Sequence, residues 1–118
     1  FSEMKEDTLR LLKRIDEMDI PDIMTIIKEL SQRKGRINEY LDLMLLWYRD
    51  VLMFKATRSA LRITYKEEIL TLQRQAAGKS FEALDHIIEA FAELRARLKA
   101  NVNFDAAVEL LLLALKEK

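Results

Sequence analysis

Apolar side chains recur every three or four residues along nearly the whole chain, and this period constrains the fold more than any other feature. Such an interval places side chains on one face of an α-helix, whereas a strand would alternate at every second residue. Turn residues are scarce, with two glycines and one proline among 118 residues. A sheet needs many tight turns, so the pattern predicts an all-α fold, a bundle of five or six helices. The clearest stripe comprises Phe81, Leu84, Ile87, Ile88, Phe91, Leu94 and Leu98.

Composition narrows the classes of function that such a bundle could serve. Acidic and basic residues balance at twenty each, so the chain lacks the net positive charge that grips nucleic acid. It has no cysteine, which excludes disulfides, thiol nucleophiles and cysteine metal sites. Its longest apolar runs, 43–48 and 110–115, fall far short of the ~20 residues that span a bilayer. Because the chain opens at Phe1 rather than Met, we expect residues 1–118 to be a single domain of a longer protein.

Capping residues mark several of the expected helix ends. Thr64 and Glu67 fit a capping box, T-x-x-E, which would open a fourth helix reaching to about residue 77. Gly78 is predicted to close that helix in a left-handed conformation. Ser80 is predicted to be the N-cap of a fifth helix, and Asn103 the N-cap of a sixth that runs from 104 to about 116.

The tripeptide Gly78-Lys79-Ser80 ends like a nucleotide-binding P-loop. A P-loop also needs a glycine five residues before the Gly-Lys-Ser, and a strand in front of it. The residue at that position is Gln73, and nothing before it has the pattern of a strand. We therefore predict no phosphate site here, and more generally no cofactor.

His86 is the only histidine, and it lies near two glutamates on the same expected helix. Glu82 precedes it by four residues and Glu89 follows it by three. A carboxylate-bridged metal site in a bundle uses Glu-x-x-His from two helices, but residue 83 is Ala83 and no second histidine exists. These residues favour a solvated surface over a metal site, and a small enzyme acting through His86 remains the least favoured alternative.

Two of the expected helices are apolar nearly all round. The six consecutive apolar residues at 43–48 span more than one full turn of the third helix, and those at 110–115 do the same in the last. A helix on the outside of a monomeric bundle should show a polar stripe. One such helix could lie at the centre of the bundle, but two indicate that some apolar surface faces another domain or chain.

Two stretches of sequence carry a resemblance to a known family. The first, Leu41 to Leu52, places Trp47-Tyr48-Arg49-Asp50 on a long helix, and the second opens the Leu-rich final helix with Asn101-Val102-Asn103-Phe104. Together they resemble the C-terminal domain of bacterial DNA polymerase III clamp-loader subunits, delta-prime first and gamma/tau second. The resemblance covers about residue 36 to the end.

The resemblance implies a helical collar domain, the C-terminal oligomerisation part of a longer chain whose ATPase-like module precedes it. In that family, five such domains pack into a ring that holds the subunits together while the sliding clamp is loaded onto DNA. It implies partners among the other clamp-loader subunits and a cytoplasmic protein. It implies no catalysis by this domain, and no direct contact with nucleic acid, membrane or small molecule. A helical adaptor unrelated to replication is the alternative.

Residues on the two apolar helices are the candidates for contact with neighbouring subunits. Catalytic, cofactor-binding and metal-binding residues are not expected in this domain. The predicted interface comprises Leu45, Trp47, Tyr48, Arg49, Leu111, Leu112 and Leu115.

Overall fold

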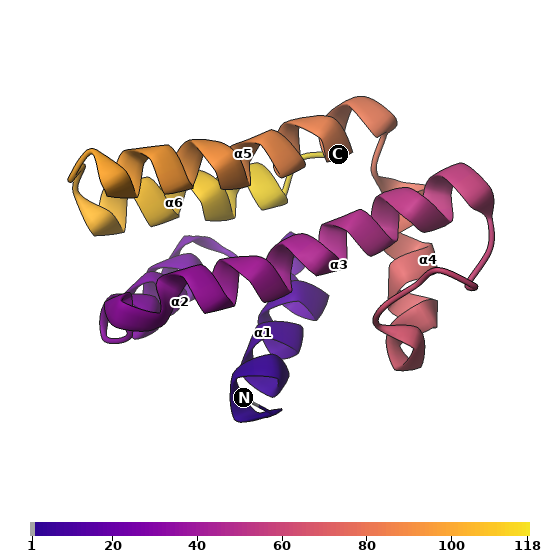
Figure 1. Ribbon diagram of the computed structural model, residues 1–118, viewed down its shortest axis with the longest axis horizontal. Coiled ribbons are helices and arrows are strands. Elements are labelled where there is room, and N and C mark those ends of the chain that lie inside the picture. The colour runs from indigo at the N-terminus through magenta and orange to yellow at the C-terminus, as the bar shows by residue number, and fades with distance from the viewer. Residues whose placement is uncertain (1) are drawn as a thin grey trace.

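The computed structural model describes residues 2–118 of the chain, and its side chains from Glu3 onward. Within this range the regular structure is helical throughout, which confirms the predicted all-α bundle (Figure 1). Short 3₁₀ turns, 15–17, 34–36 and 66–68, precede three of the α-helices. The α-helices of the described chain are α1 (Ser2–Arg14), α2 (Ile20–Ser31), α3 (Ile37–Thr57), α4 (Ile69–Gly78), α5 (Phe81–Lys99) and α6 (Phe104–Leu115).

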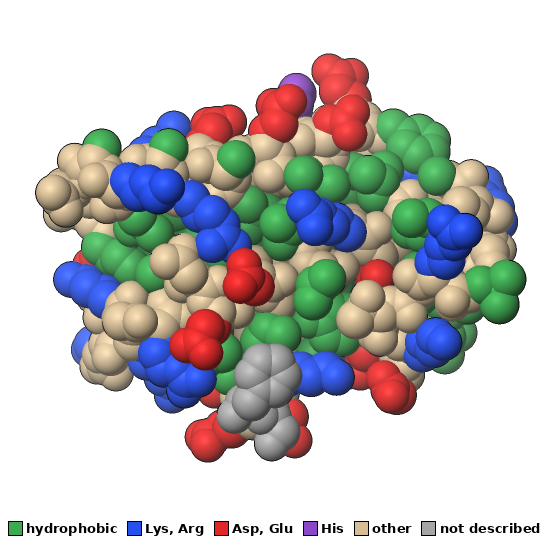
Figure 2. Space-filling model, viewed as in Figure 1, with side chains coloured by type: hydrophobic (Ala, Val, Ile, Leu, Met, Phe, Trp, Pro, Cys, Tyr) green, Lys and Arg blue, Asp and Glu red, His purple; other side chains and the backbone are tan. Residues whose placement is uncertain are grey.

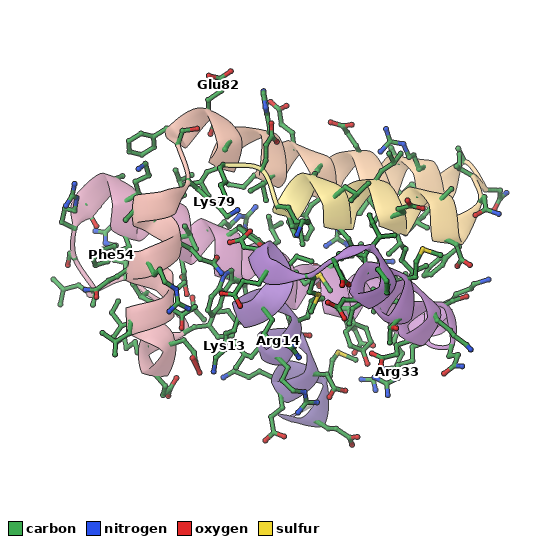
Figure 3. The ribbon with its side chains drawn as sticks, turned by 180° about the vertical axis from the view of Figure 1, so that it is seen from behind. Lys13, Arg14, Arg33, Phe54, Lys79 and Glu82 are labelled. Atoms are coloured by element: carbon green, nitrogen blue, oxygen red, sulfur yellow. The ribbon has the colours of Figure 1, made fainter. Side chains whose placement is uncertain are left out.

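The long helix α3 is the central element of the bundle. It packs against α1, α4 and α5, while α6 packs between α5 and α2 (Figure 1). Helices α2 and α6 run antiparallel: the Lys116 ammonium group lies 2.6 Å from the Met18 carbonyl oxygen, and that of Lys34 lies 5.2 Å from the Phe104 ring centroid. Helices α3 and α5 occupy the face turned to the viewer in Figure 1, and α2 and α6 the face seen in Figure 3.

Side-chain caps fix the starts of the two C-terminal helices. The Ser80 hydroxyl accepts a hydrogen bond from the Ala83 N–H at 3.0 Å, at the start of α5. The Asn103 side-chain oxygen accepts one from the Ala106 N–H at 2.9 Å, at the start of α6. Each bond satisfies a first-turn N–H that has no partner within the helix, which stabilises the helix by about 1 kcal/mol.

The capping box predicted at Thr64 is wrong. Helix α4 begins only at Ile69, after a 3₁₀ turn, and no side chain caps either element. The buried carboxylate of Asp50 in α3 holds this segment instead. It accepts hydrogen bonds from the N–H groups of Thr64, at 3.0 Å to each oxygen, and of Tyr65 at 2.8 Å. A charged acceptor on a neighbouring helix thus satisfies the Thr64 N–H, which the Glu67 side chain would have bonded in the capping box, and the Tyr65 N–H as well.

The left-handed conformation predicted for Gly78 is also wrong. No glycine among the described residues has a positive φ, and Gly78 is the last residue of α4. The chain leaves the helix at Lys79, whose backbone is extended with φ −121° and ψ 134°. Left-handed residues follow α3 and α5 instead, at Arg58 (φ 57°) and Asn101 (φ 58°). The side chain of Lys79 enters the protein interior, where its ammonium group meets the end of α6.

Replacing Asp50 with asparagine should lower the free energy of unfolding by about 2 kcal/mol, because buried hydrogen bonds to a charged group are worth more than neutral ones. The amide keeps one acceptor oxygen but loses the charge and the second acceptor. Urea unfolding followed by circular dichroism measures the loss. Asp42→Asn is the matched control, since the Asp42 side chain is 70% exposed and should change stability by less than about 0.5 kcal/mol. Equal losses for the two variants would contradict the role assigned to Asp50.

The two helices with six-residue apolar runs, α3 and α6, each bury one face in the core. Trp47 and Tyr48 of α3 have no exposed surface, and neither do Leu112 and Leu115 of α6, while Leu111 is 2% exposed. The prediction that these five side chains face a neighbouring subunit is therefore wrong. The reason is geometric, because α3 is covered on three sides and α6 on two by helices of the same chain.

Candidate interaction surface

Lys79, the lysine of the Gly-Lys-Ser tripeptide, binds the C-terminal end of α6. Its side chain is 1% exposed, and its ammonium group donates hydrogen bonds to the carbonyl oxygens of Leu115 at 2.9 Å and Glu117 at 2.7 Å. It also pairs with the Asp16 carboxylate at 2.9 Å. A cation placed on the last carbonyl groups of a helix complements the helix dipole. All three of its donors therefore act inside the protein, which leaves none for a phosphate.

Lys116, at the end of α6, makes a similar set of bonds to the turn between α1 and α2. Its ammonium group donates to the carbonyl oxygens of Ile15, Asp16 and Met18, at 3.2, 3.3 and 2.6 Å. These carbonyls lie where the first helix ends and the chain turns toward α2. Lys79 and Lys116 together tie the C-terminal end of α6 to the turn between α1 and α2, so the position of α6 on the bundle is well defined.

His86 lies exposed on α5, and its partner is Glu117 rather than either glutamate on its own helix. The Nδ1 atom lies 3.2 Å from a Glu117 carboxylate oxygen. This hydrogen bond, together with the negative charge of Glu117, raises the pKa of His86 above its ordinary value. The contact is a solvent-exposed hydrogen bond between α5 and the end of α6, without the enclosed pocket that general acid–base catalysis would need.

A groove of about 370 Å³ runs between α1 and α2, and it is lined by three acidic and three basic side chains. Asp7 forms ion pairs with Arg10 and with Arg33, the second at 3.1 Å, and Arg33 also donates to the Tyr40 hydroxyl at 2.8 Å. Figure 3 labels Arg14 and Arg33 along this side. The formal charges that line the groove therefore sum to zero.

The outward face of α6 is apolar, and we call this surface the α6 strip. Leu110 is 52% exposed and Leu113 is 40% exposed, on the side of the helix opposite its core residues. Helix α2, which packs against α6, adds Ile20 at 63% and Met24 at 52% exposure. Water-exposed leucine, isoleucine and methionine side chains on two helices that pack together are typical of a contact surface. The strip comprises Ala106, Leu110 and Leu113 of α6 with Ile20 and Met24 of α2.

A second apolar surface lies between α3 and α5, and we call it the α3–α5 strip. Leu46 is 36% exposed, and the other apolar side chains of this surface are half-buried or exposed. Figure 2 shows hydrophobic side chains gathered between the two helices on this face. At one end, Arg95 of α5 reaches Asn38 and Asp42 of α3, at 2.8 and 2.6 Å. The strip comprises Leu45, Leu46 and Met53 of α3 with Ile88 and Ala92 of α5.

Only two of the predicted interface residues lie on these surfaces. Leu45 is half-buried and Arg49 is exposed, both at the α3–α5 strip. The sequence interpretation missed Leu46, Leu110 and Leu113, although they stand within the same two runs. The stripe of core residues in each helix points the opposite way, so a helical wheel drawn with Trp47 or Leu112 facing inward would have placed them outside.

Comparison with known proteins assigns the chain to a family. The sequence model described as "DNA polymerase III, delta subunit, C terminal" matches residues 2–117. The chain belongs to this family. A search of curated proteins and a search of solved structures found no match to this chain. Membership of this family confirms the predicted relation to clamp-loader proteins, and the family description names the delta type rather than delta-prime.

Two further observations bear on what this delta-type domain can do. Among the helices of residues 2–118, none is both long enough and apolar enough to cross a bilayer. Nor do the described side chains bring together three or more histidines and carboxylates that could hold a metal ion. The candidate contact surfaces of the domain are the α6 strip and the α3–α5 strip, which lie over different pairs of helices.

Proposed function

We propose that this chain is a non-catalytic assembly domain of the DNA polymerase III clamp loader. It packs against the corresponding domains of other subunits, so that the complex can load the sliding clamp onto DNA during replication. The observation that carries the proposal is the α6 strip. After α6 has buried a full apolar face in the core, Leu110 and Leu113 still present a second one to water. Family membership supports the identity of the partners.

Within the clamp loader, we propose that the domain fills the position of the delta or delta-prime subunit. The resemblance of residues 41–52 and 101–104 supports delta-prime, and the family description supports the delta type more broadly. The proposed partners are the collar domains of the other subunits in the cytoplasm. The domain itself would contact neither nucleic acid, nor membrane, nor a small molecule. Lys79 and Lys116 support this proposal, because their charges are engaged in holding α6 in place.

Mixing the domain with the corresponding domains of the other clamp-loader subunits tests the proposal. We expect a complex whose mass, measured by light scattering, exceeds that of any single domain. Leu110→Glu combined with Leu113→Glu should abolish this complex and leave the helical circular dichroism unchanged. The two side chains are 52% and 40% exposed, so each substitution should alter stability by only about 0.5 kcal/mol.

A matched control introduces the same two charges elsewhere on the surface. Leu61 and Leu70 are 86% and 78% exposed, at the far end of the bundle near the start of α4. Leu61→Glu combined with Leu70→Glu should assemble like the wild type. Assembly that survives the α6 substitutions, or a well-folded domain that binds none of the other subunits' domains, would refute the proposed function.

A further inference from the structure

The charges of this neutral chain are unevenly distributed along the sequence. Residues 51–81 contain six lysine and arginine residues but only two carboxylates, and residues 51–66 contain no carboxylate at all. Two of these charges are satisfied by α1 and by the turn that follows it, because Glu68 pairs with Lys13 and Lys79 pairs with Asp16. The remaining charges are the cations Lys55, Arg58, Arg62, Lys66 and Arg74 and the carboxylate Glu67.

Four of these cations belong to the end of the bundle that α3 and α4 form. We call it the α3–α4 end, and it comprises residues 54–66 and the side of α4 that carries Gln73. Lys55, Arg58, Arg62 and Lys66 enter none of the ion pairs formed among residues 3–118. All but the half-buried Lys55 are exposed, and Figure 2 shows blue side chains at this end of the molecule.

The carboxylates adjoining this end do not neutralise it. Asp50 is buried and is bonded to the N–H groups of Thr64 and Tyr65. Glu82 is exposed at the start of α5, and in Figure 3 it points away from α3 and α4. Glu67 is the one carboxylate on the connecting segment itself that has no partner among the described side chains. The surface therefore keeps an excess of positive charge.

A groove of about 280 Å³ lies among these cations, between the end of α3 and the side of α4. Apolar atoms form much of its walls, and two leucines stand in water on the same part of the chain: Leu61 is 86% exposed and Leu70 is 78% exposed. Leucines this exposed gain free energy when a partner covers them. The groove is lined by Phe54, Lys55, Arg58, Gln73, Ala76 and Ala77.

We propose that the α3–α4 end binds an acidic segment of another protein. The carboxylates of that segment would meet the four unpaired cations, and its apolar side chains would enter the groove and cover the two leucines. Lys55 keeps its charge for this contact, because the group to which its ammonium donates is the neutral carbonyl oxygen of Ala76, at 3.0 Å.

The neutral side chains of this surface favour a protein partner over a nucleic acid. Single-stranded nucleic acid binds where cations alternate with aromatic rings whose faces are open for stacking. Here the Lys55 ammonium group lies 5.0 Å from the Phe81 ring centroid, and Phe54 is half-buried in the wall of the groove. The exposed apolar groups are leucines, which accept aliphatic or aromatic side chains but offer a base no ring to stack on.

A synthetic peptide of four Asp-Asp-Leu repeats is the probe, because it combines carboxylates with aliphatic side chains. With isotope-labelled protein, we expect a dissociation constant on the order of 100 µM and amide NMR shifts confined to residues 54–66 and 70–77. Raising the salt concentration from about 50 to about 500 mM should weaken binding about tenfold, because exposed charges are screened. A peptide of four Asn-Asn-Leu repeats, which lacks the charge, should bind at least tenfold more weakly, and equal binding would refute the acidic class of partner.

Removing two of the four cations tests the site directly. Arg58→Gln combined with Arg62→Gln should weaken binding of the acidic peptide about tenfold and leave the urea transition in place, because both side chains are exposed. Lys28→Gln combined with Lys99→Gln is the matched control. It makes the same change in net charge at exposed positions on α2 and at the end of α5, away from the α3–α4 end (Figure 1), and should bind the peptide like the wild type.

Three further results would overturn the inference. The first is a wild-type chain that does not bind the acidic peptide at millimolar concentration. The second is an equal loss of binding in the control pair, which would reduce the effect to net charge. The third is a single-stranded oligonucleotide of the same net charge that binds this end more tightly than the peptide does, which would make the surface a nucleic-acid site.

Peptide binding and subunit assembly can be separated with the leucine variants already described. Helix α4 packs on α3, whereas α6 packs between α5 and α2, so a segment bound at the α3–α4 end would leave the α6 strip free. Leu61→Glu combined with Leu70→Glu should weaken peptide binding at least tenfold and leave assembly intact. Leu110→Glu combined with Leu113→Glu should do the reverse. If the wild-type chain assembles but does not bind the peptide, this inference fails and the proposed function stands.

Discussion

Lys79→Met is expected to lower the free energy of unfolding by about 3 kcal/mol, one of the largest losses available to a single substitution in this chain. The methionine can fill the same space, so the loss comes from the hydrogen bonds and not from a cavity. The carbonyl oxygens of Leu115 and Glu117 lose a charged donor, and the Asp16 carboxylate loses its partner. Urea unfolding monitored by circular dichroism measures the change.

A double substitution separates the two parts of this loss. The Asp16 side chain is 27% exposed, so water can solvate its charge once Lys79 is gone. Adding Asp16→Asn to Lys79→Met should therefore recover only a minor part of the stability, while the cost of the two carbonyl groups remains. Lys99→Met is the matched control, because Lys99 is exposed and forms no ion pair with the described residues; we expect a change below about 0.5 kcal/mol. A Lys79→Met protein as stable as this control would show that the ammonium group does not hold α6.

The fold class could be predicted from the sequence because the helices are specified locally. The apolar period, Ser80 and Asn103 act within one or two turns, and the structure has helices and caps where these residues indicate. The start of α4 could not be predicted in this way. It depends on a carboxylate fourteen residues away from Thr64, and a buried acceptor on another helix leaves no trace in the local pattern.

The candidate surface was harder to predict for a related reason. A run of six apolar residues covers a whole turn of a helix, so composition alone does not tell which half meets the core. Neighbouring helices decide the matter, and they turn Trp47 inward and Leu46 outward although the two are adjacent. The role of Lys79 was hidden in the same way, since the tripeptide around it resembles a phosphate-binding sequence while its ammonium group caps a helix 36 residues farther along.

Leu112→Glu should unfold the domain, with a loss of more than about 4 kcal/mol, since an unpaired carboxylate would be buried among apolar side chains. Leu112 has no exposed surface, and it packs within the central core on the inner side of α6. The expected result is loss of the cooperative urea transition and of most helical circular dichroism at 25 °C. The carboxyl group could escape burial only if α6 left its place between α5 and α2.

Leu113→Glu, one residue farther along, provides the matched comparison. The same charge then stands at a position that is 40% exposed, and the domain should stay folded while losing affinity for its neighbours. Adjacent leucines would thus separate folding from assembly, because a step of one residue turns a helix by about 100°. If Leu112→Glu remained folded and failed to assemble, Leu112 would face a neighbouring domain and α6 could not lie with that side chain in the core. If Leu113→Glu also unfolded the domain, the outward face of α6 would belong to the core, and the α6 strip would have no role in assembly.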